Sequence, residues 1–132
     1  MKVHLNSDDG KREIDIHIED SDVKSLDNTL SLIIYPVLLS FREKVKIAPV
    51  TMYPSDVAPY KLKGESEDDY DSRLTLAENE ALEAWKKALD SMLFSFKQVT
   101  HGDPTWEYDA LQKKRVQDGL DLFAKHFRSL WL

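Results

Sequence analysis

The pattern of apolar and polar positions changes along the chain, and each change predicts a different element. From Glu13 to Ile18, isoleucine alternates with charged residues or histidine, the period-two pattern of a strand with one buried face. The turn signal Ser7–Gly10 separates this run from residues 2–6, so we expect a β-hairpin within residues 1–20. Two strands alone are marginally stable in water, so the isoleucine face should lie on helices or the hairpin should extend a sheet in a partner subunit.

Helical spacing replaces this alternation further along the chain. Apolar residues recur at intervals of three and four over about residues 23–45 and again over about 75–98, and each set occupies one helical face. The first of these predicted helices contains Pro36, where a kink is expected. Asp103 and Pro104 form a start signal, a capping carboxylate before a residue preset for the first turn, and they predict a third helix over about 104–130.

Residues 48–74 show no clean periodicity. They contain three prolines, one glycine and the acidic run Glu65–Asp71, which predicts a long acidic connecting loop at the surface. The whole chain, residues 1–132, is therefore expected to be a single α+β domain. Its predicted architecture is an N-terminal β-hairpin packed on about three α-helices.

Composition narrows the classes of function. The 132 residues include 24 acidic and 18 basic side chains, a net charge of −6, which repels a polyphosphate backbone and argues against general nucleic-acid binding. Cysteine is absent, so disulfides and thiolate metal sites are excluded. The longest apolar stretch, Leu32–Leu39, is too short to span a bilayer, and we expect a soluble intracellular protein with no membrane contact.

No recognisable catalytic motif is present. The four glycines are isolated from one another, so neither a P-loop nor a dinucleotide fingerprint can form. No two histidines stand four residues apart on a helix, and a calcium loop at Asp68–Leu76 fails because Arg73 occupies a ligand position. We therefore expect no catalytic residues, no bound metal and no cofactor, and a protein that is not an enzyme.

Some residue types still suit ligand binding. Trp85 suits stacking on a base, and Arg115 and Lys125 suit phosphate. Asp27 and Thr29, at the entry to the first predicted helix, offer polar contacts. The structural alternatives are a core tryptophan, solvated basic residues and helix caps, and the sequence alone leaves both interpretations open.

The C-terminal segment Arg115–Trp131 predicts an amphipathic helix with two phenylalanines and a tryptophan. Chain ends usually fray, so a terminus this apolar should dock either on the protein's own core or on a second copy. A homo-oligomer is therefore expected.

Three blocks of sequence, Asp20–Leu38, Trp85–Phe96 and Arg115–Trp131, resemble a family of small uncharacterised proteins of tailed bacteriophages. The shared features are a Leu-Asp-x-Thr-Leu entry to an Ile-x-Pro helix, a Trp-x-x-x-Leu-Asp-x-Met helix and a C-terminal Leu-Phe-x-Lys segment that ends in Leu-Trp. The chain departs from this pattern at His126, where the family usually has an aromatic residue, and at Leu132. The resemblance implies a phage origin and the host cytoplasm, and it carries no established activity.

Together these features predict a non-enzymatic phage accessory binding protein that counteracts host defence. One form of this hypothesis is that a homo-oligomer sequesters a nucleotide immune signal between its subunits. The alternatives are an adaptor or inhibitor that blocks a host protein through the acidic segment, and a minor virion or assembly protein.

Overall fold

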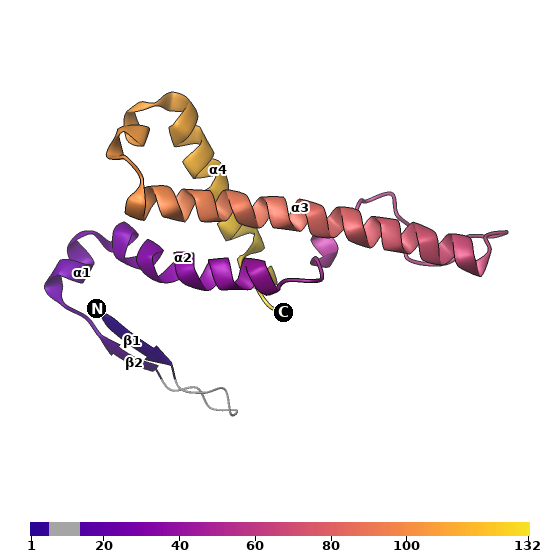
Figure 1. Cartoon of the computed structure of the whole chain (residues 1–132), viewed down its shortest axis with the longest axis horizontal. Helices are drawn as coiled ribbons and strands as arrows, with labels where there is room; N and C mark the ends of the chain where they lie inside the picture. The colour runs from indigo at the N-terminus through magenta and orange to yellow at the C-terminus, as the bar shows by residue number, and fades with distance from the viewer. Residues whose placement is uncertain (6–13) are drawn as a thin grey trace.

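The structure, a computed structural model, describes residues 1–5 and 14–132. Within these residues a two-stranded antiparallel hairpin precedes four α-helices, which confirms the α+β class. The strands are β1 (Lys2–Leu5) and β2 (Ile14–His17), and the helices are α1 (Asp20–Lys24), α2 (Leu26–Lys44), α3 (Glu67–His101) and α4 (Ala110–His126). Three short 3-10 helices join them: η1 (Val50–Met52), η2 (Pro104–Tyr108) and η3 (Phe127–Ser129). The long helix α3 forms the axis of the molecule, and α2 and α4 pack on it (Figure 1).

The hydrophobic core lies along the C-terminal two thirds of α3. Trp85, Leu89 and Met92 follow one another at helical spacing and are completely buried. Two edge-to-face aromatic pairs fix the neighbouring helices: the Phe41 ring of α2 lies 6.4 Å from that of Trp85, and the Phe123 ring of α4 lies 4.9 Å from that of Phe96. The three helices therefore share one core.

Small residues allow α4 to approach α3 closely. The Ser95 hydroxyl donates a hydrogen bond to the Val116 carbonyl across the helix pair at 2.7 Å. One turn further along α4, Gly119 is buried against Ser91 and Ser95, where a Cβ atom would overlap with the Ser91 carbonyl and the Ser95 hydroxyl. The crossing of α3 and α4 therefore requires glycine at position 119.

The predicted hairpin is confirmed where it is described, while its turn signal, Ser7–Gly10, lies outside the described residues. Val3 pairs with Ile16 and Leu5 with Ile14, so these four side chains share one face of the ribbon. The expected packing of this face on the helices is not found in the described residues. Both strands are exposed along their whole length, and their backbones contact each other rather than a helix.

The predicted helix boundaries require correction. The helix expected over 23–45 is divided at Ser25 into α1 and α2, and α2 continues through Pro36. The helix expected over 75–98 is the longer α3. The helix expected over 104–130 consists of η2, α4 and η3.

The acidic loop predicted over residues 48–74 is wrong for its last part, because α3 already begins at Glu67. The Ser66 side chain accepts a hydrogen bond from the Asp69 amide at 3.1 Å and so caps the helix. Glu67, Asp68 and Asp69 occupy the first turn, where carboxylates are stabilised by the positive end of the helix dipole. The acidic run is thus a helix start.

The apolar C-terminal segment docks only in part. His126 is buried and Phe123 is half-buried, whereas Phe127 and Trp131 are 61% and 72% exposed.

None of the helices in the described part of the chain combines the length and apolar character that a bilayer crossing requires.

Candidate protein-binding site

The structure places the first two predicted site residues in the junction between α1 and α2. Asp27 lies exposed in the first turn of α2. The Thr29 hydroxyl donates a hydrogen bond to the Asp22 carbonyl at 2.8 Å. Thr29 therefore ties the two helices together, and it does not cap α2, whose N-cap residue is Ser25.

Trp85 is a core residue. It is completely buried, with the Phe41 and His126 rings packed edge-on against it, the latter at 5.3 Å between ring centroids. A nucleobase cannot reach the indole without opening the core. Burial, followed by the charge of the adjacent Lys125, lowers the pKa of His126 below its usual range.

The two basic residues of the predicted site lie far apart on α4. The Arg115 guanidinium lies over the Phe94 ring at 3.6 Å from its centroid, and Lys125 is exposed. The ten-residue step between them corresponds to about 15 Å along the axis of α4.

The start of α2 is also far from Trp85. The Asn28 side chain donates a hydrogen bond to the Val99 carbonyl at 3.3 Å, so the entry of α2 lies beside the end of α3. Along α3, Val99 is about 21 Å from Trp85 at the helical rise. The five predicted residues are therefore not gathered into one pocket within a single chain.

A tryptophan with basic neighbours occurs instead near the C-terminus. Lys44, Lys46 and Trp131 line an open hollow of about 240 Å³ whose other walls are mostly apolar. The exposure of Trp131 makes its ring available to a ligand. The hollow is smaller than the roughly 300–1,000 Å³ of usual small-molecule pockets.

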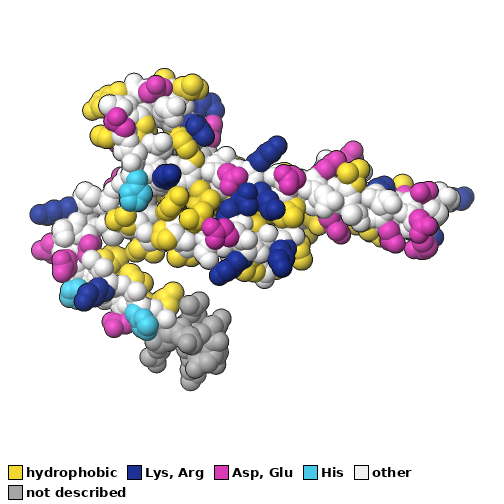
Figure 2. Space-filling view, viewed as in Figure 1, with side chains coloured by type: hydrophobic (Ala, Val, Ile, Leu, Met, Phe, Trp, Pro, Cys, Tyr) yellow, Lys and Arg dark blue, Asp and Glu magenta, His cyan; other side chains and the backbone are white. Residues whose placement is uncertain are grey.

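The most distinctive surface is a projecting arm formed around the N-terminal half of α3. We define the acidic arm as residues 56–83, which comprise the end of the α2–α3 connection and the N-terminal half of α3. The arm extends past the end of α2, and the connecting segment runs back along the helix (Figure 1). Asp and Glu side chains are gathered along it (Figure 2).

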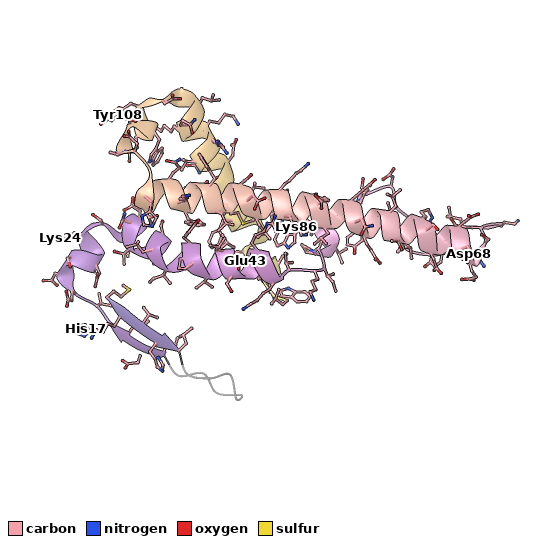
Figure 3. All side chains as sticks on the ribbon, in the orientation of Figure 1. His17, Lys24, Glu43, Asp68, Lys86 and Tyr108 are labelled. Atoms are coloured by element: carbon pink, nitrogen blue, oxygen red, sulfur yellow. The ribbon has the colours of Figure 1, made fainter. Side chains whose placement is uncertain are left out.

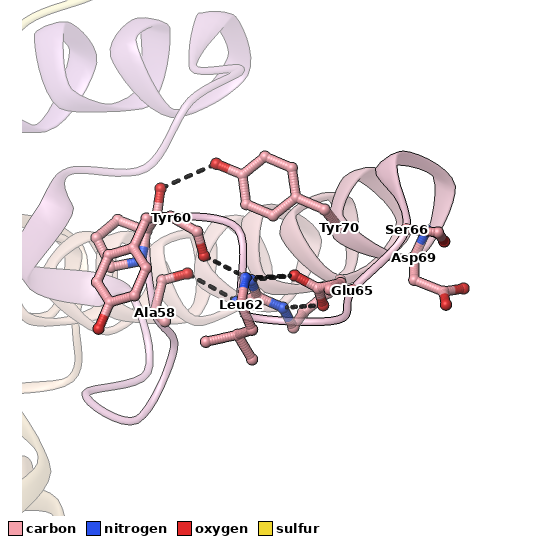
Figure 4. A network of polar contacts seen from close by, with 9 residues as sticks. Ala58, Tyr60, Leu62, Glu65, Ser66, Asp69 and Tyr70 are labelled. Atoms are coloured by element: carbon pink, nitrogen blue, oxygen red, sulfur yellow. Dashed lines mark hydrogen bonds and ion pairs between the residues drawn. The ribbon is translucent and has the colours of Figure 1, made fainter.

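Arg73 holds the connecting segment on the arm. Its guanidinium donates hydrogen bonds to both carboxylate oxygens of Glu65, each at 3.0 Å, and to the carbonyls of Ala58 and Tyr60 at 2.7 and 2.9 Å (Figure 4). The Tyr70 hydroxyl adds a hydrogen bond to the Pro59 carbonyl at 3.0 Å. The planar guanidinium thus organises several backbone and carboxylate acceptors at once.

Local features turn the segment back toward Arg73. Gly64 adopts a φ of 82°, a conformation that favours glycine, and begins the reversal. The Leu62 amide donates to the Glu65 carboxylate at 3.1 Å. Hydrogen bonds from Arg73 first and then from the Leu62 amide lower the pKa of Glu65, while the pKa of Arg73 is raised by its hydrogen bonds to Glu65.

An apolar groove lies at the base of the arm. It encloses about 390 Å³, and its lining includes Val50, Tyr53, Pro54, Val57, Pro59 and Leu74. The groove brings residues of the connection together with one turn of α3. The arm therefore combines a carboxylate-rich surface with a neighbouring apolar recess.

Charge is unevenly divided between the arm and the rest of the chain. Residues 56–83 contain nine acidic and three basic side chains, so the arm carries the whole net charge of −6. The remaining residues contain fifteen of each sign. The molecule therefore has a neutral body and an acidic extension.

The sequence pattern does not single out Arg73 as an organising residue. From the sequence, Arg73 counts only as evidence against a calcium loop. The signal that could have pointed to its role is that it is the one arginine among the acidic residues of this segment.

In the described residues, no three His, Asp or Glu side chains are grouped as metal ligands. The chain matches no protein family, no curated protein and no solved structure.

Proposed function

We propose that this chain is a non-enzymatic phage accessory protein that acts by binding another protein through its acidic arm. The observation that carries the proposal is the segregation of charge: the entire net charge of −6 lies on one ordered extension of a neutral body. A binding site of this kind needs no catalytic group. The charge segregation favours a protein that binds and blocks another protein over one that sequesters a nucleotide.

The arm is suited to recognising a basic protein surface. Most of its carboxylates lie on α3, and the Arg73 network holds the connecting segment against this helix, so binding does not have to order a flexible loop, and less conformational entropy is lost. Concentrated negative charge steers a basic partner and gives specificity and a high association rate. The groove beside Leu74 offers a place for an apolar anchor residue of the partner.

The resemblance to phage proteins supplies the biological setting of the proposal. In the host cytoplasm, a partner covered by the arm would be a host protein with a basic surface, and covering it would counteract a defence function. A basic virion or assembly protein would be recognised by the same chemistry.

The test is capture of host proteins by the immobilised chain and by two matched variants. The arm variant replaces three exposed glutamates of α3, Glu78, Glu80 and Glu83, with glutamine. The control neutralises three exposed acids of the body, Asp20→Asn, Glu43→Gln and Glu107→Gln. Both variants change the net charge equally and leave the ion pairs of the described residues intact.

The proposal predicts a host protein that binds the unmodified chain and the control, is lost from the arm variant, and is released as salt rises. Equal capture by all three proteins would contradict it, as would the absence of any salt-sensitive partner.

The hollow near the C-terminus favours one second candidate, the nucleotide-sequestering function. Trp131 offers an exposed ring for a base, and Lys44 and Lys46 offer positive charge for phosphate. A nucleotide bound only by the folded chain would raise its melting temperature. This candidate predicts such a rise with a nucleotide panel and its loss in Trp131→Ala, and an unchanged melting temperature across the panel would contradict it.

A further inference from the structure

An apolar surface is left uncovered at the end of the molecule opposite the acidic arm. We call it the hairpin–α2 surface. Its hairpin half consists of Val3, Leu5, Ile14 and Ile16, and its helical half of Leu26, Leu30, Ile33 and Val37. It is separate from the arm and does not depend on the function proposed above.

No other element of the described residues covers the apolar face of the hairpin half. Val3 opposite Ile16 and Leu5 opposite Ile14 are 42% to 63% exposed, while the other face of the ribbon carries polar residues. A two-stranded ribbon gains stability only when such a face is packed. The pairing of the strands therefore places four apolar side chains on one face, and this face is exposed to solvent in the single chain.

The helical half has the same character. Leu26, Leu30, Ile33 and Val37 follow the four-three-four spacing of a helix-packing seam. Leu26, Leu30 and Val37 are 48%, 45% and 66% exposed, and Ile33 is half-buried. They lie beside, not on, the stripe that α2 packs against α3.

α2 lacks a charged face over its central turns. From Thr29 to Phe41 no charged side chain occurs. Helices of this kind are normally buried on all sides, yet among the described elements α2 contacts only α1 and α3. At least one further element is needed to cover it.

The two halves border a common hollow. Met1 and Val3 of the hairpin face Leu32 and Ile33 of α2 across a space of about 240 Å³. At the edge of this hollow, the Met1 amino group forms an ion pair with Asp22 at 3.1 Å. The N-terminal end of the hairpin is thus held near α1, while its apolar face remains exposed.

We propose that a second copy of this chain covers the hairpin–α2 surface, so that the protein is a homodimer. The chain exposes 10011 Å², whereas a compact monomer of 15.3 kDa exposes about 7,100 Å². The arm accounts for part of the excess of roughly 2,900 Å². A standard interface buries about 800 Å² of each partner, which is well below this excess.

Charge favours a second copy as the occupant. The body is neutral, so two bodies meet without net repulsion, while the two arms each carry the −6. Asp68 on the arm and His17 on the hairpin lie at opposite ends of the molecule (Figure 3). A two-fold contact through the body matches one apolar surface with itself and leaves both arms free for partners.

Sedimentation equilibrium of the full chain and two single variants tests the proposal. Val37→Glu acts on the helical half and Ile16→Lys on the hairpin half, and each introduces a charge that a dimer would have to bury. Leu111→Glu is the matched control, because Leu111 is 74% exposed on α4, away from this surface. We expect a dimer for the unmodified chain and the control, and at least a tenfold weaker association for both variants.

The circular dichroism spectrum of each variant must be recorded along with its sedimentation mass, to show that the variant is folded. The altered side chains are exposed in the single chain, so the variants should retain their helical signal as monomers. Because the chain has no cysteine, Val37→Cys and Leu111→Cys provide a second measurement through the accessibility of one thiol. As protein concentration rises, labelling of the thiol in Val37→Cys should become slower, and labelling of the thiol in Leu111→Cys should not.

A monomeric unmodified chain at micromolar concentration would overturn the proposal. So would a dimer that survives Val37→Glu and Ile16→Lys but is lost in Leu111→Glu, since this would move the interface to α4. If the hairpin–α2 surface instead serves a different protein, the chain sediments as a monomer and the thiol at position 37 reacts at a rate independent of concentration.

Discussion

Arg73 and Glu65 form a two-point ion pair, with Nε to Oε2 and Nη2 to Oε1 both at 3.0 Å. Because Glu65 belongs to the connection and Arg73 to α3, this pair fixes the segment that folds back along the acidic arm. One guanidinium therefore makes most of the hydrogen bonds that hold this segment on the arm.

Replacing Arg73 with alanine should release the connecting segment without unfolding the body. Lys61 and Lys63 lie in that segment, so trypsin should cleave after them several-fold faster in Arg73→Ala than in the unmodified chain. Arg42→Ala is a suitable control, because it removes the Arg42–Asp90 ion pair between α2 and α3 without touching the arm. Equal cleavage rates in Arg73→Ala and the unmodified chain would show that Arg73 does not hold the segment.

The same contact should respond to acid. The pKa of Glu65 is lowered in the folded chain, so the ionised carboxylate is favoured there, and its contribution is present above the usual value of 4.5. The contribution is lost as the pH falls below 4.5 through the folded pKa. The Leu62 amide resonance, followed by NMR, should therefore shift below pH 4.5, and Glu65→Gln should abolish that transition.

His126 should make global stability sensitive to mildly acidic pH. Burial lowers its pKa from the usual 6.5, so the unfolded chain binds a proton more readily than the folded chain between the two pKa values. The contribution of His126 to the free energy of unfolding should be fully present above pH 6.5 and fall as the pH drops through that window. Urea unfolding of His126→Phe, which keeps an aromatic ring beside Trp85, should lose this part of the pH dependence.

Gly119→Ala tests the close approach of α3 and α4. The added methyl group would overlap with the Ser91 carbonyl and the Ser95 hydroxyl, and relieving this overlap should lower the free energy of unfolding by about 1–3 kcal/mol. Gln117→Ala on the exposed side of α4 should change it by no more than about 0.5 kcal/mol. A neutral Gly119→Ala variant would mean that the helices do not meet as described.

Trp85 should behave as a core residue in fluorescence. In a chain with Trp106→Phe and Trp131→Phe, emission should be blue-shifted and nearly insensitive to acrylamide, because Trp85 is completely buried. A Trp85-only chain that acrylamide quenches as readily as free tryptophan would restore the ligand-stacking interpretation.

The elements that depend on local patterning could be predicted from the sequence. The isoleucine alternation gives the correct second strand, and the apolar spacing locates the helices around Leu38, Leu89 and Val116. The start of α3 could not be found in this way because acidic residues lack apolar periodicity, and the capping by Ser66 and the dipole effect of the first turn decide the structure there.

The candidate site was harder to predict because it depends on tertiary placement. Helical spacing cannot distinguish a core tryptophan from a stacking one, and Trp85 proved to be in the core while Trp131 is exposed. The role of Arg73 requires four acceptors from a segment that folds back, and no local pattern encodes that reversal. The isoleucine alternation predicts that the hairpin face needs a cover, but it does not decide between the helices and a partner subunit.

The hairpin–α2 surface is open in the single chain, and we propose that a second copy covers it. The most direct test is sedimentation equilibrium of the unmodified chain over a range of micromolar concentrations. A homodimer should give a mass approaching twice the 15.3 kDa of the chain, with reversible dissociation on dilution. A mass of one chain at every concentration would contradict it.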